Sequence, residues 1–220
     1  MAKILDFVRR AAAPAPTPAA AAGTLVEDFS IEVMPRTAAK VADFRDLLPA
    51  GTRVYVAHID GTPMAEMVAT ARRLVDEGFR VMPHVPARGV LSAAELDARL
   101  AAYADAGVIE ALVLAGGISR PQGPFADSLA LLRTGRFEAR GFTRLHVAGH
   151  PEGNRDIDPA GGESVAMAAL RAKADFARET DAEMAVVTQF AFEAAPVIAW
   201  ADRLAAAGID LPLHIGVAGP

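Results

Sequence analysis

The stretch Arg53–Val85, RVYVAHIDGTPMAEMVATARRLVDEGFRVMPHV, combines two kinds of local pattern. Two short apolar runs, Arg53–Ile59 and Arg80–Val85, flank a segment whose apolar residues recur at helical spacing, Thr62–Glu77. A threonine-proline pair marks the start of that segment, and a glycine follows its end. A strand, a helix and a second strand in this order predict a parallel β-α-β unit.

The same alternation continues through the rest of the chain. Apolar runs predict seven strands, at Phe29–Met34, Arg53–Ile59, Arg80–Val85, Glu110–Ala115, Arg144–Gly149, Met184–Phe190 and Leu211–Val217. Helical spacing predicts the segments between them, at Thr37–Leu48, Thr62–Glu77, Ser92 to just before Gly107, Phe125–Arg133, Gly162–Thr180 and Ala194–Ala207. The pattern predicts an α/β protein, a (β/α)8 TIM barrel whose active site lies at the carboxyl ends of the strands. Since only seven runs are present, we expect a C-terminally truncated chain without the eighth strand, and the alternative is an open parallel sheet.

The first residues differ in composition from the barrel pattern. Residues 1–10 predict a short amphipathic helix, and residues 11–23 are almost entirely alanine and proline. Because proline blocks regular helix and such a composition cannot build a core, we interpret residues 1–23 as a terminal helix and linker. The barrel domain is expected over residues 24–220.

Composition limits the class of function. With 220 residues, 52% of them hydrophobic and 22% charged, the chain is expected to fold as one domain. A net charge of −5 argues against nucleic-acid binding, and no apolar run reaches the roughly 20 residues of a membrane span. The absence of cysteine excludes disulfides and thiolate chemistry and fits a cytoplasmic location. Barrels of this size often associate, so a homo-oligomer is an open expectation.

Two polar side chains interrupt apolar runs. Glu32 lies within Phe29–Met34, and alternation puts it on the face opposite Ile31 and Val33. If that face points into a barrel mouth, loss of water should raise its proton affinity and make it a general acid. Gln189 offers a donor and an acceptor, which suits the edge of a heterocycle. The alternatives are a salt bridge for the glutamate and a bond to a loop backbone for the glutamine.

The histidines all lie in or directly after the predicted strands. They are His58, His84, His146, His150 and His214. His84 and His150 are expected at loop entries facing a ligand, and His146 and His214 as core residues. No His-x-His or His-Glu-x-x-His spacing is present, so a metal site is only an alternative.

A lysine and a pair of glycines complete the candidates. Lys173 lies on a predicted helix, where a solvated surface charge is the ordinary expectation. Gly116 and Gly117 follow the fourth run and let a ligand approach the backbone closely. Neither a G-x-G-x-x-G nor a P-loop motif occurs, which argues against the common nucleotide-binding folds.

Six stretches, taken in order, resemble the methylenetetrahydrofolate reductase family. They are Phe29–Arg36, Met82–His84, Leu112–Gly117, Ala148–Gly153, Leu170–Lys173 and Val187–Glu193. That family is a (β/α)8 barrel that holds FAD at the strand carboxyl ends. It passes a hydride from NADH or NADPH through FAD to 5,10-methylenetetrahydrofolate, which gives 5-methyltetrahydrofolate. The resemblance therefore implies an oxidoreductase of folate-dependent one-carbon metabolism and methionine biosynthesis, with a small-molecule folate substrate.

The resemblance also implies roles for single residues. Glu32 matches the acidic residue that helps to open the five-membered ring of the folate. Gln189 matches a glutamine that contacts the pterin or the nicotinamide, and Phe190 follows it in the substrate site. Lys173 matches a lysine near the FAD phosphates.

Further matches line the expected flavin site. His84 and the turn from His150 to Glu152 correspond to stretches beside the flavin, and Gly116 and Gly117 correspond to the loop after the fourth strand. Here the chain departs from the family, which has Arg-Gly-Asp where this sequence reads Ala-Gly-Gly at 115–117. The carboxylate that tunes the flavin and contacts folate is therefore missing at Gly117.

A second departure follows the acid. The family has Phe-Phe-Pro-Pro where this chain has Val-Met-Pro-Arg at 33–36. Together the departures leave open a flavin-independent reductase, a different one-carbon folate reaction, and a folate- or flavin-binding protein that lacks turnover. A metal-dependent hydrolase using the strand-end histidines is the remaining alternative.

Overall fold

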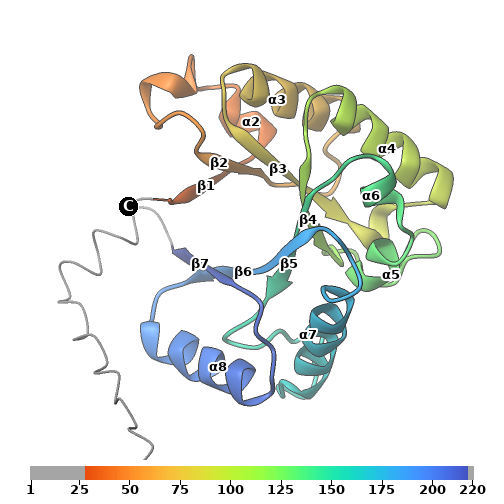
Figure 1. Cartoon of the computed structure of the whole chain (residues 1–220), viewed down its shortest axis with the longest axis vertical. Helices are drawn as coiled ribbons and strands as arrows, with labels where there is room; N and C mark the ends of the chain where they lie inside the picture. Colours follow the sequence, from red (N-terminus) through yellow and green to blue (C-terminus); the bar gives the residue numbers. More distant parts are fainter. Residues whose placement is uncertain (1–27, 218–220) are drawn as a thin grey trace, which may run out of the picture.

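The computed structural model describes residues 28–217 as an α/β fold with seven parallel strands (Figure 1). The strands are β1 (Ser30–Val33), β2 (Arg53–Val56), β3 (Arg80–Pro86), β4 (Glu110–Leu114), β5 (Arg144–Gly149), β6 (Glu183–Ala191) and β7 (Leu213–Val217). Each of the seven predicted runs is confirmed as a strand. The α/β class is likewise confirmed.

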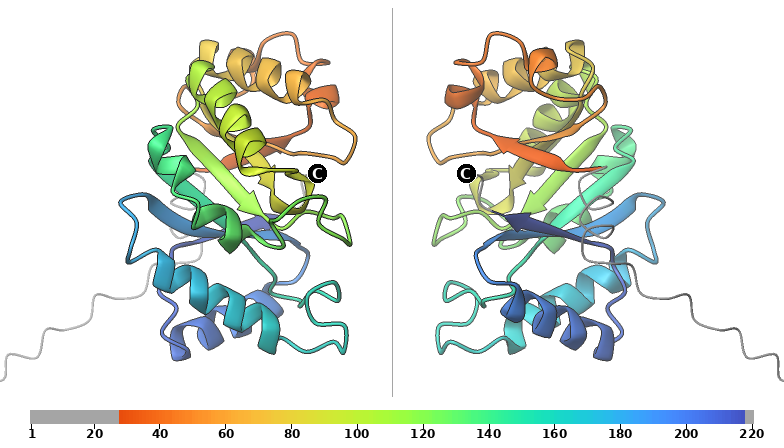
Figure 2. Two further views of the ribbon diagram at one scale, coloured as in Figure 1. Left: turned by 90° about the vertical axis from the view of Figure 1, so that its right-hand side faces the viewer. Right: turned by 90° about the vertical axis from the view of Figure 1, so that its left-hand side faces the viewer.

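The strands lie in the sheet in the same order as in the sequence, β1 to β7. The sheet curls, with its helices on the outer side, so that the strands form a half-barrel (Figure 1). Figure 2 shows α3 and α4 at one end of the molecule and α7 and α8 at the other, with strands between them. Within residues 28–217 no pairing joins β7 to β1. Because all the strand pairings are parallel, the carboxyl ends of the strands lie at the same end of the half-barrel.

Most helices fall where helical spacing predicts them. The helices that follow β2 in the chain are α3 (Met64–Asp76), α4 (Ala93–Asp105), α5 (Ser128–Leu132), α6 (Arg136–Ala139), α7 (Ser164–Phe176) and α8 (Ala194–Ala206). The start of α4 is capped as predicted, since the Ser92 hydroxyl accepts a hydrogen bond from the Glu95 amide. α5 begins only at Ser128, where the Asp127 side chain caps it. The short α6, which follows a left-handed Gly135, was not predicted.

The first predicted helix, Thr37–Leu48, is wrong. The chain forms α2 (Pro35–Ala38) and, separately, a 3-10 turn, η1 (Phe44–Asp46). The Asp43 carboxylate accepts a hydrogen bond from the Arg45 amide and so starts the second turn. Local bonding of this kind competes with a continuous helix.

Alternation along each strand separates two apolar layers. Residues such as Val54 and Val56 point outward and belong to the large core shared with the helices, where Leu74 of α3 is fully buried. The residues between them point inward, and Tyr55 and Met82 form a smaller cluster inside the curl. The inner face of the sheet, which does not pack against the helices, is therefore available for a ligand-binding site.

Charged residues begin five of the strands, β2 to β6, and those of β2, β4, β5 and β6 form ion pairs with one another. The Arg53 Nε donates to Glu110 Oε2 at 2.7 Å, and both side chains are almost fully buried. Arg144 lies 3.4 Å from the other Glu110 oxygen and also contacts the exposed Glu183. The amino-terminal end of the half-barrel is thus held by ion pairs, whereas the carboxyl-terminal end remains open to a ligand.

A tyrosine and two histidines fill the middle layer. The Tyr55 hydroxyl and His146 Nδ1 lie 2.8 Å apart, and the His146 and His214 rings are 4.8 Å apart between centroids. His146 is fully buried, as a core histidine should be, while His214 is half-buried. Burial lowers the pKa of His146 to about 2 and also lowers the pKa of His214.

These buried histidines predict that the folded state loses stability at acidic pH. Burial lowers the pKa of His58, His146, His150 and His214, so between the folded values and about 6.5 the unfolded chain binds more protons. Stability then rises with pH in this window and is lost as the pH falls below about 6.5. We expect the Tm to fall between pH 7 and pH 5 in buffers of equal ionic strength.

A matched variant checks the cause. Changing Tyr55 and His146 together to phenylalanine keeps both rings and removes both polar partners, so the fall in Tm should become smaller. A Tm that stays constant or rises as the pH falls to 5 contradicts the assignment.

Two expectations concern other parts of the chain. The terminal helix and linker at residues 1–23 lie outside the described residues. Among the helices between residues 28 and 217, none has the length and apolar character that crossing a bilayer requires.

Candidate functional site

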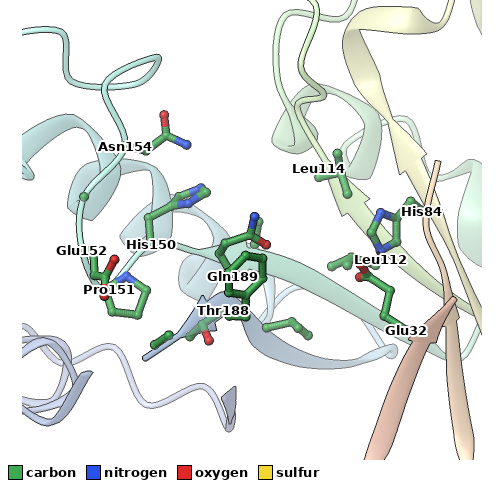
Figure 3. A pocket seen from close by; sticks show the side chains of 15 residues that line it. Glu32, His84, Leu112, Leu114, His150, Pro151, Glu152, Asn154, Thr188 and Gln189 are labelled. Carbon is green, nitrogen blue, oxygen red and sulfur yellow. Dashed lines mark ion pairs between the residues drawn. The ribbon is translucent and has the colours of Figure 1, made fainter. Parts of the chain in front are cut away.

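A cavity of about 300 Å³ opens at the carboxyl ends of the strands (Figure 3). Its lining comes from β1, β3, β4 and β6 and from β5 with the loop that follows it. The lining residues are Glu32, His84, Leu112, Leu114, Ala148, His150, Pro151, Glu152, Gly153, Asn154, Val187, Thr188, Gln189, Phe190 and Ala191. Its size is at the lower end of the range for small-molecule pockets.

Glu32 and Gln189, predicted from opposite ends of the sequence, line this one cavity. Figure 3 shows Glu32 beside His84 on one wall and Gln189 between that wall and His150. The predicted general acid and the predicted heterocycle contact therefore face the same space.

The surroundings of Glu32 differ from the expectation. Its side chain is 59% exposed, so the prediction that it is withdrawn from water is wrong. The reason is its position on β1, which lies at the edge of the sheet. Within the described residues, β1 pairs only with β2. Burial therefore gives no support to the role of Glu32 as a general acid.

His84 lies next to this carboxylate. Its Nε2 is 3.2 Å from Glu32 Oε2, and the side chain is only 13% exposed. The two groups are not aligned as a hydrogen bond, and Nε2 has no hydrogen-bond partner among the described residues. A buried polar atom without a partner is costly, so a ligand that bonds to it gains free energy.

A bulge in β6 presents Gln189 and Phe190. The pairing of β6 with β7 shifts register between Val187 and Phe190, and the Thr188 hydroxyl accepts a hydrogen bond from the Gly216 amide at 2.9 Å. A Cβ at Gly216 would lie 2.9 Å from the Thr188 carbonyl oxygen. The bulge thus depends on a glycine in the neighbouring strand, and bulges beside active sites re-aim side chains.

Replacing Gly216 with alanine should therefore disturb the site without unfolding the protein. The added methyl group pushes the backbone at Thr188 and Gln189, and a displacement of about 1 Å in a binding group can cost about 10²-fold in activity. Steady-state measurement of the folate-dependent turnover that the sequence resemblance implies checks this. Gly162→Ala is the control, since a Cβ there meets nothing within 4 Å, and equal activities of the two variants would contradict a positioning role.

Two aromatic rings extend the cavity outward from β6. Phe190 lines the cavity, and its ring lies 5.6 Å from that of Phe192 at 82°. The side chains are 51% and 80% exposed, respectively. Such a surface suits the planar part of a ligand that projects from the cavity.

A basic group lies behind the wall that carries His150, outside the cavity lining. Burial lowers the pKa of Lys173 on α7, while Asp127 raises it. Burial, and then the charge of Lys173, lowers the pKa of the cavity residue His150. Lys173 is half-buried rather than a freely solvated surface charge. An anionic group beside it would offset the cost of burying its charge.

Six of the nine predicted site residues line the cavity, and Gly116, Gly117 and Lys173 do not. The glycines follow β4, and Lys173 lies behind His150 on α7. Sequence reasoning missed Thr188, Asn154 and the supporting Gly216. Only Gly216 carried a usable signal, because a glycine inside a strand often marks a bulge.

No three histidine or acidic side chains between residues 28 and 217 gather as metal ligands. The metal-hydrolase alternative therefore has no ligand set in this part of the chain. No protein-family model matches this sequence.

Proposed function

We propose that this protein is a methylenetetrahydrofolate reductase-like oxidoreductase that reduces 5,10-methylenetetrahydrofolate to 5-methyltetrahydrofolate with NADH or NADPH through FAD. The observation that carries the proposal is the meeting of Glu32 and Gln189 in one cavity at the strand carboxyl ends. The sequential order of seven curled parallel strands supports the fold that goes with it, a closed (β/α)8 barrel.

The residues present fit FAD in two respects. Lys173, which is half-buried near His150 but outside the cavity lining, offers a positive charge to the phosphates, and the unpartnered Nε2 of His84 suits a polar ring edge. When bound, FAD would carry the hydride between the nicotinamide and the folate. His150 and Glu152 line the cavity on the side away from His84 (Figure 3).

The chain's own side chains supply binding and proton transfer. Glu32 donates a proton to the folate nitrogen that separates from the methylene carbon as the five-membered ring opens. His84 Nε2 lies 3.2 Å from this carboxylate and leaves its own hydrogen-bonding capacity free for a ligand beside the acid. The Gln189 carboxamide donates to and accepts from the pterin edge, which fixes the ring against Phe190. The Glu32 carboxylate then regains its proton from water, to which it is exposed.

Binding and turnover measured together test the proposal. The purified protein, mixed with FAD and freed of excess ligand, should retain flavin absorbance. It should then oxidise NADH or NADPH in proportion to added 5,10-methylenetetrahydrofolate. A protein that binds neither FAD nor 5-methyltetrahydrofolate would overturn the proposal.

A second candidate is a folate-binding protein without this turnover. The observation that favours it is Gly117, where the family's carboxylate is absent. Tight binding of 5-methyltetrahydrofolate with no folate-dependent oxidation of either nicotinamide cofactor would support this candidate over the reductase.

A further inference from the structure

The exposed carboxylate of Glu32 is, by itself, poorly suited to hold a proton at neutral pH. Its side chain is 59% exposed, and a carboxyl group in water ordinarily has a pKa of about 4.3. Such a group carries few protons at pH 7, whereas a general acid works best with a pKa near the operating pH. An acid in this position therefore requires a neighbour that carries protons at neutral pH.

His84 is the neighbour that the structure places beside it (Figure 3). Its Nε2 lies 3.2 Å from Glu32 Oε2, and both residues line the cavity. This nitrogen is buried and has no hydrogen-bond partner among the described residues. His84 is held in β3, which pairs with a strand on each side, whereas Glu32 lies on the edge strand β1. A rotation of the exposed carboxylate is therefore sufficient to complete a hydrogen bond to the fixed ring.

Few titratable groups face His84 in the part of the chain that the structure describes. Glu32 approaches from β1, and His58, after β2, feels the charge of His84. On the other side, β4 contributes leucines, and Leu112 is paired in register with His84. A protonated His84 therefore has one close counter-ion, the carboxylate of Glu32.

The other two histidines at this end of the strands are unsuited to carry the proton. Burial, and then the charge of Arg99, lowers the pKa of His58, which does not line the cavity. Burial, and then the charge of Lys173, lowers the pKa of His150. Both rings are neutral at pH 7 as a result. Imidazole is the side chain that ordinarily titrates between pH 5 and 8, so His84 is the remaining candidate.

We propose that His84 is a positioning residue of the acid, whose Nε2 holds the proton that Glu32 passes to the folate. This inference rests on the proposed function. Between turnovers, water protonates the pair through the exposed carboxylate, and the proton rests on Nε2. In the reaction, the Nε2–H bond breaks and the proton moves to Glu32 Oε2.

From this oxygen the proton passes to the folate nitrogen. The bond from that nitrogen to the methylene carbon breaks, and its electron pair stays on the nitrogen and forms the new N–H bond. His84 ends as neutral imidazole, Glu32 ends as carboxylate, and the positive charge ends on the opened folate.

Single-turnover kinetics across pH 5 to 8 test this role, with the full chain loaded with FAD, reduced by NADH or NADPH and mixed with 5,10-methylenetetrahydrofolate. His84→Gln keeps a hydrogen-bonding side chain but carries no proton, so the rate at pH 7 should fall about 10- to 100-fold. Lowering the pH to about 5 protonates the carboxylate directly and should restore most of this rate. Glu32→Gln lacks the acid and should gain nothing at pH 5.

A matched control and a measurement without turnover complete the experiment. His58→Gln, outside the cavity lining, should follow the pH profile of the unaltered protein. In the ligand-free chain, Glu32→Gln should change how the NMR signals of the His84 ring depend on pH and leave those of His150 as they were. Circular dichroism at each pH confirms that the variants are folded.

The outcomes separate the two proposals. If the unaltered protein transfers no hydride to the folate, the proposed function fails and this inference fails with it. If it does, but His84→Gln is as fast at pH 7 or is slowed equally at pH 5 and pH 7, the role of His84 is overturned while the proposed function stands. Loss of bound flavin from His84→Gln in place of rescue by acid, or unchanged His84 signals in Glu32→Gln, would overturn that role as well.

Discussion

Replacing Glu32 with glutamine should lower folate-dependent turnover by about 10²- to 10⁴-fold, the usual contribution of a general acid. Glutamine keeps the shape and the hydrogen-bonding reach of the side chain but has no proton to donate to the leaving nitrogen. Reduction of bound flavin by NADH or NADPH needs no such proton and should remain largely intact. Stopped-flow measurement of the two half-reactions separates these effects.

A second carboxylate in the same cavity provides the control. Glu152 also lines the cavity, but it is exposed in the loop after β5, on the wall opposite Glu32 (Figure 3). Glu152→Gln should leave the folate half-reaction close to that of the unaltered protein. Full folate activity in Glu32→Gln, or equal losses in both variants, would remove Glu32 from the mechanism.

Replacing Glu110 with alanine should lower the free energy of unfolding by about 3–5 kcal/mol, because it leaves a buried arginine without its counter-ion. The Arg53 side chain is 4% exposed and donates two hydrogen bonds to this carboxylate. For a domain of this size, such a loss lowers the Tm by roughly 10 °C. Urea unfolding and calorimetry measure the effect.

Two further variants show whether the buried charge is the cause. Glu183→Ala removes an exposed partner of Arg144 and should change stability by less than about 1 kcal/mol. Changing Arg53 and Glu110 together to methionine removes both charges and should recover most of the loss. A double variant as unstable as Glu110→Ala would mean that the unpaired charge of Arg53 does not cause the loss.

The fold was predictable because its signals are local. Each apolar run and each helical spacing arises within one segment, and capping at Ser92 fixed the start of α4. The structure of the segment after β1 could not be predicted from such local signals. Its apolar residues have helical spacing, but Pro35 starts a single turn and the Asp43 carboxylate starts another. Side-chain bonds to the backbone outweighed periodicity there.

The candidate site was predictable only in part. Glu32, His84 and Gln189 stand out because polar groups interrupt apolar strands, and parallel strands bring such groups to one end. The approach of His84 Nε2 to Glu32 Oε2 joins two strands that are not neighbours in the sheet, and no local pattern predicts it. The exposure of Glu32 likewise depends on β1 lying at a sheet edge, which is a property of the assembled sheet.

Anaerobic spectroscopy of the protein loaded with FAD tests the central claim most directly. NADH or NADPH should bleach the flavin, and 5,10-methylenetetrahydrofolate should then restore its colour with formation of one equivalent of 5-methyltetrahydrofolate. A protein that takes up flavin but stays bleached after the folate is added, or that takes up none, would contradict the reductase assignment.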